Sequence, residues 1–317
     1  MIILAVCLSI ILLILLGGSI YAYLSAFYSP AKRKVPKDAI PHTSNYDKAR
    51  DVMHTLAAEL KEKPFEEIYI TSYDGKRLFG RYYHMKDGAP LQIQFHGYKG
   101  SAYRDFCGGS RLAMDISHNI ILVDQRAHGK SEGRTITFGV KERLDCKAWV
   151  EYATSRFGNI PIFIVGVSMG GATVLMASDL DLPDNVVGVI ADCPYSSPAS
   201  IIKKVCREQL RLPPRLVFPL VTLGGFLFGH FNVNSQSAVK SVKNAKFPIL
   251  IIHGEADGFV PCDMSREIFD ACAFEKYLYT FEGADHGLSY IMDNERYKNI
   301  TGEFIDKQLT KFYNKIK

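Results

Sequence analysis

From Leu91 onward, short apolar runs alternate with longer stretches that have the spacing of amphipathic helices. Strands that are apolar throughout are buried on both faces of a sheet, and a helix between successive strands favours parallel pairing. Asp74-Gly75 is a predicted tight turn between two earlier strand-like runs, which indicates an antiparallel hairpin at one edge. We therefore predict a three-layer α/β fold with a mostly parallel, eight-stranded sheet. The predicted strands cover residues 65–73, 77–85, 91–95, 119–123, 162–167, 186–191, 247–253 and 277–281.

One interval breaks this alternation, because about fifty-five residues separate the strand that ends at Ala191 from the strand that begins at Phe247. A structureless loop of that length is uncommon inside a domain. The apolar run over residues 216–231 and the helical spacing before it predict an inserted helical lid over about 194–245 instead. Prolines and Arg215 interrupt the run, which disfavours a second membrane span there.

The first 31 residues contain no Asp, Glu, Lys or Arg and are apolar on every face. About 20 apolar residues are enough to cross a bilayer as a helix. A cleavable signal peptide is the alternative, but it would carry a basic segment ahead of a shorter apolar core. We therefore predict a single-pass membrane anchor over residues 1–28 that stands outside the folded domain. A linker over 29–45 and a domain over 46–317 are predicted to follow.

The residues that flank this apolar run predict its orientation. Basic residues occur only after the run, so the positive-inside tendency places the domain on the cytoplasmic side. Aromatic residues near its end resemble a belt at the membrane interface. The basic residues are Lys32, Arg33, Lys34 and Lys37, and the aromatic residues are Tyr21, Tyr23, Phe27 and Tyr28.

Composition excludes several classes of function. The formal net charge is +5, and the sequence has no basic stripe of the kind that binds nucleic acid. The seven cysteines are scattered and include no Cys-x-x-Cys pair, so neither a disulfide framework nor a zinc site is indicated. We expect most of them to be buried as small apolar side chains.

The segment 162–177 carries the most specific chemical signal. A predicted strand leads into Gly166-Val167-Ser168-Met169-Gly170, and a predicted helix follows immediately. A serine nucleophile on a sharp strand-to-helix turn needs small neighbours, and this motif supplies a glycine on each side. The N-terminus of the helix favours the negative charge that develops during attack. Both flanks therefore support Ser168 as a nucleophile over an incidental serine in a turn.

A serine hydroxyl needs a general base to become nucleophilic at neutral pH. In this architecture the chain order is serine, acid, histidine, and His286 alone among the nine histidines lies beyond the last candidate acid strand. Asp257 lies in the loop after the preceding strand, from which a carboxylate can reach the imidazole. Its predicted role is to hold the tautomer of His286 and to stabilise the imidazolium. The weaker candidates for this role are Glu255, Asp263, Asp285 and Asp192.

Acyl transfer also needs hydrogen-bond donors aimed at the developing alkoxide. The backbone N–H of Met169, the residue after the nucleophile, is one predicted donor. The backbone N–H of Tyr98 is the other, in the loop 96–101 after the first central strand. The Tyr98 ring either closes the acyl site or simply packs. His96 comes before the serine in the chain, so we interpret it as a support for this loop.

These motifs together resemble the α/β-hydrolase superfamily over roughly Phe65 to the C-terminus. They occur in the family's order, and Asp124-Gln125-Arg126-Ala127-His128-Gly129-Lys130-Ser131 is similar to a structural loop beside the site, so His128 receives no catalytic role. The anchor and the His-Gly-Tyr loop look like those of the membrane-anchored BEM46-like and serine aminopeptidase S33-like hydrolases. The resemblance implies esterase, thioesterase, lipase or peptidase activity, and neither a metal nor an organic cofactor.

The leading hypothesis is a serine hydrolase that cleaves carboxylic ester or related acyl bonds through an acyl-enzyme. The apolar lid and anchor suggest a small, lipid-like substrate near a membrane, and no nucleic-acid partner is expected. A peptidase acting on short peptides is the second hypothesis. It ranks lower because Glu208 is the only acid within 201–231 that could hold a peptide terminus. The third hypothesis, a non-catalytic binding protein, conflicts with the complete set of reactive residues.

Overall fold

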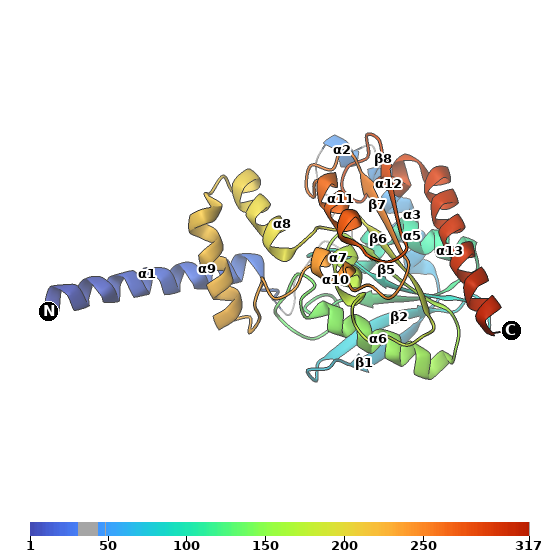
Figure 1. Ribbon diagram of the computed structural model, residues 1–317, viewed down its shortest axis with the longest axis horizontal. Helices are drawn as coiled ribbons and strands as arrows, with labels where there is room; N and C mark the ends of the chain where they lie inside the picture. Colours follow the sequence, from blue (N-terminus) through green and yellow to red (C-terminus); the bar gives the residue numbers. More distant parts are fainter. Residues whose placement is uncertain (31–43, 48, 317) are drawn as a thin grey trace.

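The computed structural model describes residues 1–30, 44–47 and 49–316. An eight-stranded sheet runs through the domain in the order β1-β2-β4-β3-β5-β6-β7-β8 (Figure 1). The first two strands form the expected hairpin, β2 also runs antiparallel to β4, and every other neighbouring pair is parallel. This arrangement confirms the predicted fold class. The strands are β1 (Glu66–Thr71), β2 (Arg77–Tyr83), β3 (Leu91–Phe95), β4 (Asn119–Asp124), β5 (Ile162–Val167), β6 (Val186–Asp192), β7 (Ile249–Gly254) and β8 (Lys276–Phe281).

Helices cover both faces of the sheet. Successive side chains of a strand point to opposite faces, so a strand that is apolar throughout needs an apolar layer on each side. In β5, Ile162 and Ile164 join one apolar cluster, whereas Phe163 and Val165 join the other. The first cluster is completed by α6 (Glu142–Phe157), α7 (Met169–Ala177), α10 (Ala238–Val242) and α11 (Cys262–Ala271). The second is completed by α3 (Arg50–Glu62), α4 (Ala102–Asp105), α5 (Cys107–Asp115) and α13 (Asn294–Ile316). Two single-turn helices, α2 (Ser44–Asp47) and α12 (Ser289–Met292), complete this part of the domain.

Between β6 and β7 the chain leaves the sheet and forms the helices of the predicted lid. These are α8 (Pro198–Lys204), the π-helical turn η1 (Val205–Gln209) and α9 (Pro214–Leu227). In Figure 1, α8 and α9 project away from the sheet toward α1 (Ile2–Ala26). Near the end of the lid range, α10 packs on α7 and belongs to the body of the domain.

Among the described residues, α1 is the one helix long and apolar enough to cross a membrane, with a mean hydropathy of 2.9 over its most apolar window. The expectation that this whole segment stands outside the domain is wrong for its C-terminal end. Phe27 is fully buried, and its ring meets Phe138 and Phe231 edge-on at centroid distances of 5.7 and 5.0 Å. Phe27 is therefore a core residue of the domain and does not belong to a membrane-interface belt.

The chain continues from this buried end as part of the domain. Tyr28 forms an isolated antiparallel bridge with Thr135, and the backbone N–H of Ser29 donates to the carbonyl of Arg134. Residues 31–43, which make up most of the predicted linker and include its basic residues, lie outside the described part of the chain.

Candidate active site

Ser168 occupies the turn between β5 and α7, as its motif predicts. Its backbone angles are φ 57° and ψ −116°, a conformation that residues with a side chain rarely adopt. A Cβ atom on Gly166 would lie 2.2 Å from the carbonyl carbon of Gly170, and one on Gly170 would lie 1.7 Å from the carbonyl oxygen of Phe95. These close backbone contacts therefore require glycine at positions 166 and 170. The residue with the strained backbone is Ser168, whose hydroxyl the turn presents.

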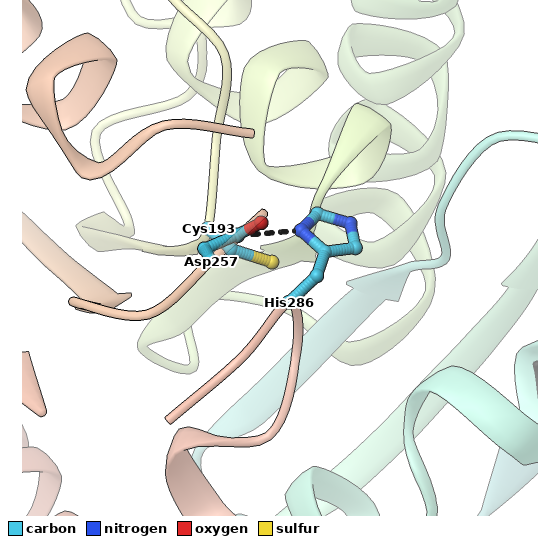
Figure 2. Close-up of side chains that lie close together, drawn as sticks. All are labelled: Cys193, Asp257 and His286. Carbon is cyan, nitrogen blue, oxygen red and sulfur yellow. Dashed lines mark hydrogen bonds and ion pairs between the residues drawn. The ribbon is translucent and has the colours of Figure 1, made fainter. Parts of the chain in front are cut away.

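The structure brings the three predicted triad residues together at the carboxyl ends of the strands. His286 Nε2 lies 2.9 Å from Ser168 Oγ, and His286 Nδ1 lies 2.7 Å from Asp257 Oδ2. Figure 2 shows the imidazole of His286 turned toward the carboxylate of Asp257. These distances fit a serine hydroxyl that donates to Nε2 and an Nδ1–H that donates to the carboxylate.

Asp257 is held in place by its own loop as well as by the imidazole. Its Oδ1 atom accepts backbone N–H bonds from Phe259 at 2.9 Å and from Val260 at 2.7 Å. Burial alone would raise the pKa of Asp257, but the interactions with His286 and His253 outweigh burial and hold that pKa well below its usual value. The carboxylate is therefore ionised and preorganised to stabilise an imidazolium.

His253, at the end of β7, contacts the same carboxylate oxygen and received no role from the sequence. Its Nε2 lies 3.2 Å from Asp257 Oδ2 and 2.8 Å from the carbonyl of Val260, and its Nδ1 lies 2.6 Å from Ser265 Oγ. Because a carbonyl can only accept, Nε2 carries a hydrogen and the Ser265 hydroxyl donates to Nδ1. His253 thus positions the acid, and the only signal for it in the sequence is its place four residues before Asp257.

The other candidate acids have different partners. Asp192 Oδ2 accepts from the Tyr297 hydroxyl at 3.1 Å, and burial raises the pKa of Asp192 to about 6. Asp285 Oδ1 accepts the backbone N–H groups of His286 and Gly258. Glu255 accepts from Thr280, and Asp263 pairs with Arg266. Among these candidates, Asp257 is the carboxylate that is hydrogen-bonded to the imidazole of His286.

Cys193 lies beside Asp257 and His286, and one potential ligand atom from each of the three lies within 4.8 Å of the others (Figure 2). A metal ion here would need the thiolate and would displace the hydrogen bond between carboxylate and imidazole. Burial raises the pKa of the Cys193 thiol well above its usual value, with further contributions from Asp192 and Asp257. The chemistry of these donors therefore favours a carboxylate hydrogen-bonded to an imidazole over a metal site.

The predicted oxyanion donors belong to two segments that adjoin the nucleophile. Met169 is the first residue of α7, and Tyr98 follows Gly97 in the loop after β3. A Cβ atom on Gly97 would lie 3.3 Å from Ser168 Cβ, so this loop passes directly beside the nucleophile. The buried carboxylate of Asp105 accepts the Gly97 N–H at 2.8 Å and fixes the loop in that place. The donor roles of the Tyr98 and Met169 amides stay predictions.

Two further histidines hold the loops around the site. His96 Nδ1 donates to the carbonyl of Gly97 at 2.8 Å, and its Nε2 accepts the Gln125 N–H at 3.1 Å. Burial lowers the pKa of His96, which keeps the ring neutral, as these two bonds require. His128 Nε2 accepts the Lys99 N–H at 3.0 Å. Both rings therefore support the loop that contains Tyr98.

A cavity of about 510 Å³ opens at the triad, within the size range of sites for small molecules. Its walls include Ser168, His286, Tyr98 and Phe259, together with Gln209 from the lid. Tyr98 is anchored elsewhere as well, because its hydroxyl donates to the carbonyl of Ala26 and its ring lies 4.8 Å from that of Phe138. The ring thus both packs and lines the cavity.

Comparison with known proteins gives a consistent assignment. The family model described as the alpha/beta hydrolase fold matches residues 93–217. The esterase Pf2001 of Pyrococcus furiosus shares the fold, with a TM-score of 0.63 and 21% identity over 85% of this chain and 96% of that chain. The chain therefore has the α/β-hydrolase fold. This is the fold of the superfamily that its motifs resemble.

Its relatives also include members of the predicted branch. The match to protein bem46 of Schizosaccharomyces pombe is 23% identical and covers 69% of this chain and 68% of that protein. YqkD of Bacillus subtilis is 26% identical, with 62% of this chain matched to 64% of its own length. Rat monoglyceride lipase is 26% identical over 71% of this chain and 85% of that protein. These similarities support hydrolase activity.

Proposed function

We propose that this α/β-hydrolase is a membrane-anchored serine hydrolase that cleaves carboxylic ester or related acyl bonds. The observation that carries the proposal is the hydrogen-bonded series from Ser168 through His286 to Asp257, at the wall of a cavity large enough for a substrate. A strained nucleophile, an oriented base and an ionised acid form the set that acyl transfer to serine requires.

In the proposed reaction, Ser168 Oγ attacks the carbonyl carbon while its proton passes to His286 Nε2. The tetrahedral oxyanion accepts the backbone N–H groups of Tyr98 and Met169. The intermediate then collapses, and His286 gives the proton to the leaving alcohol oxygen, which leaves an acyl group on the serine. Water that loses a proton to His286 attacks this acyl-enzyme and releases the acid. Asp257 remains ionised throughout and stabilises the imidazolium.

Two observations favour an ester over a peptide as the substrate. A peptidase for short peptides would need a carboxylate in the lid to hold the peptide amine, and Glu208 is the only acid in that part of the sequence. The structure pairs Glu208 with Lys204 at 2.6 Å, so this carboxylate is already neutralised. The names of the relatives, a monoglyceride lipase and an esterase, point in the same direction.

The membrane part of the proposal rests on α1. A cleaved leader would take with it side chains that the domain uses, because Ala22 is buried and the Tyr23 hydroxyl is hydrogen-bonded to Thr135 Oγ1 at 2.9 Å. We therefore infer that the segment is retained as an anchor. The basic residues that follow it favour the cytoplasmic side for the domain.

The test is labelling of the full-length protein in detergent with a fluorophosphonate probe, which reacts with activated serines. The wild type and a Ser235→Ala control at an exposed serine are expected to label, whereas Ser168→Ala is not. A panel of p-nitrophenyl esters beside aminoacyl amides then separates an esterase from a peptidase. Labelling that survives Ser168→Ala, or turnover of the amides alone, would refute the proposal.

A further inference from the structure

We propose that α9 and the loop before it form a second membrane-binding element, which lies in the interface of the same bilayer that α1 enters. The partner of this surface is a lipid bilayer with anionic headgroups. A consequence, which rests on the proposed function, is that the ester reaches the active site from the lipid phase. The membrane contact itself is independent of catalysis.

The outward face of α9 is apolar and is left uncovered by the described residues of the chain. Leu216, Leu223 and Phe226 are 71%, 36% and 63% exposed, and their spacing of seven and three residues places them on one side of the helix. The preceding loop adds Leu210 and Leu212, which are 56% and 44% exposed. A group of large apolar side chains exposed together in this way marks a surface that binds a partner other than water, such as a protein, a ligand or a membrane.

The opposite face of α9 is fixed to α1. A Cβ atom on Gly224 would lie 2.4 Å from the carbonyl oxygen of Ser19, so the two backbones approach closely at a glycine. The rings of Tyr23 and Phe228 lie 5.8 Å apart, and Val221 is buried between the elements. The position of α9 is therefore set by the part of α1 nearest the domain.

The crossing geometry gives α9 a definite depth and direction. In Figure 1, α9 runs steeply across α1, close to the end of α1 that meets the domain. About 20 helical residues span the apolar part of a bilayer, so residues 2–21 of α1 fill it and Ser19 to Tyr23 lie at one interface. A helix that crosses α1 steeply at this level lies nearly in the plane of the membrane.

Charge around this surface complements anionic lipid. Four basic residues are exposed along the lid from α8 to the start of α9: Lys203, Arg207, Arg211 and Arg215. The single acid among them, Glu208, is paired with Lys204. Basic residues that flank an apolar face are typical of segments that bind the interface of an anionic membrane.

The catalytic cavity opens beside this element. Gln209 lines the cavity with Ser168, and the next residue, Leu210, belongs to the exposed apolar loop. On the other side, the loop with the predicted oxyanion donor is tied to α1, since Tyr98 and the Lys99 Nζ donate to the carbonyls of Ala26 and Ser25. The nucleophile therefore lies within reach of an ester whose acyl chain stays in the bilayer.

Depth-dependent lipid quenching tests the membrane contact directly. Among the described cysteines Cys7 alone is exposed, so Cys7→Ser allows a single labelled site to be introduced. An environment-sensitive fluorophore at Phe226→Cys is compared with one at Phe274→Cys, which is 44% exposed and follows α11 away from the lid. Both full-length proteins are reconstituted in vesicles of phosphatidylcholine with phosphatidylglycerol.

We expect bromolipids to quench the label at position 226 and to leave the label at 274 unchanged. Equal quenching at both positions, or none at 226, would overturn the membrane contact. A blue-shifted emission at position 226 that bromolipids do not quench, but that increases with protein density, would identify a second copy of the chain as the partner. That result would also overturn the membrane contact.

A paired activity assay tests the route of the substrate. The double variant Leu216→Asp, Phe226→Asp is expected to lower hydrolysis of a long-chain ester in vesicles by about tenfold, because charges on this face weaken its insertion. Hydrolysis of a soluble short-chain ester and fluorophosphonate labelling should stay at the wild-type level, and Phe274→Asp should change neither. Equal loss on both esters, or no loss on the vesicle ester, contradicts this route. If the wild type cleaves neither ester, the proposed function fails, whereas quenching at 226 still decides the membrane contact.

Discussion

Replacing Asp257 with asparagine tests the hydrogen bond on which the proposed chemistry depends. In the native protein, Oδ2 accepts from the imidazole of His286 at 2.7 Å, and His253 Nε2 lies 3.2 Å from the same oxygen. Oδ1 accepts two backbone N–H groups of its own loop, so an asparagine will keep its carbonyl oxygen there. Its NH2 group then faces both imidazoles, and a donor cannot bond to the Nδ1–H of His286. The ring shifts its hydrogen to Nε2, where it can no longer accept from Ser168.

The size of the effect follows from this change of tautomer. Loss of the correctly oriented base in a triad lowers kcat by roughly 10³ to 10⁴. At about 1.36 kcal/mol for each factor of ten, this corresponds to about 4–5.5 kcal/mol of transition-state stabilisation. Because the side chain keeps its shape and the cavity wall is unchanged, KM should move little. Ser168→Ala should lose more activity than Asp257→Asn, since it removes the nucleophile itself.

The assay measures kcat and KM of the full-length protein on a soluble p-nitrophenyl ester, with Asp285→Asn as the matched control. Asp285 accepts the backbone N–H groups of His286 and Gly258, which an asparagine oxygen can also accept. The control should therefore keep its activity within about threefold. If Asp257→Asn stays within about tenfold of the wild type while Asp192→Asn is inactive, the acid has been assigned to the wrong strand.

Four further substitutions test packing and burial in the domain, each by thermal or chemical unfolding of the purified protein. Gly170→Ala should destabilise it by at least about 3 kcal/mol, because its Cβ would meet the carbonyl oxygen of Phe95 at 1.7 Å. Gly302→Ala, whose Cβ meets open space in α13, should stabilise it by about 0.5–1 kcal/mol. A Gly170→Ala protein more stable than Gly302→Ala would contradict this account. Burial raises the pKa of Asp192 to about 6, so its contribution to stability is lost as the pH rises from about 4 through 6. Asp192→Asn should leave stability at pH 4 unchanged and raise it at pH 8 by up to about 3 kcal/mol, whereas a gain at both pH values would exclude titration as the cause. Phe27→Ala should cost about 3–5 kcal/mol, since the ring is fully buried; a cost below about 1 kcal/mol would show that the end of α1 is not part of the core.

Much of the fold could be read from local sequence because its causes are local. Apolar runs that lack polar alternation, such as 162–167, require burial on both faces of a sheet, and the intervening helices then impose parallel pairing. The glycines around Ser168 point to the sharp turn because only they tolerate backbone contact there. The chain order of serine, acid and histidine narrowed the candidate triad to a few residues, since each of the three lies in the turn or loop that follows a recognisable strand.

Only the tertiary structure could decide which of these candidates meet. Asp192 ends β6 and Asp257 follows β7 at the same edge of the sheet. The sequence around them does not show that Asp192 contacts Tyr297 while Asp257 contacts His286. The end of α1 is a similar case, because its hydropathy is that of a free membrane helix whereas Phe27 is buried in the domain. These outcomes depend on how segments far apart along the chain pack together. Hydrophobic periodicity shows only whether a residue is buried. The tertiary packing determines which other residues it is buried against.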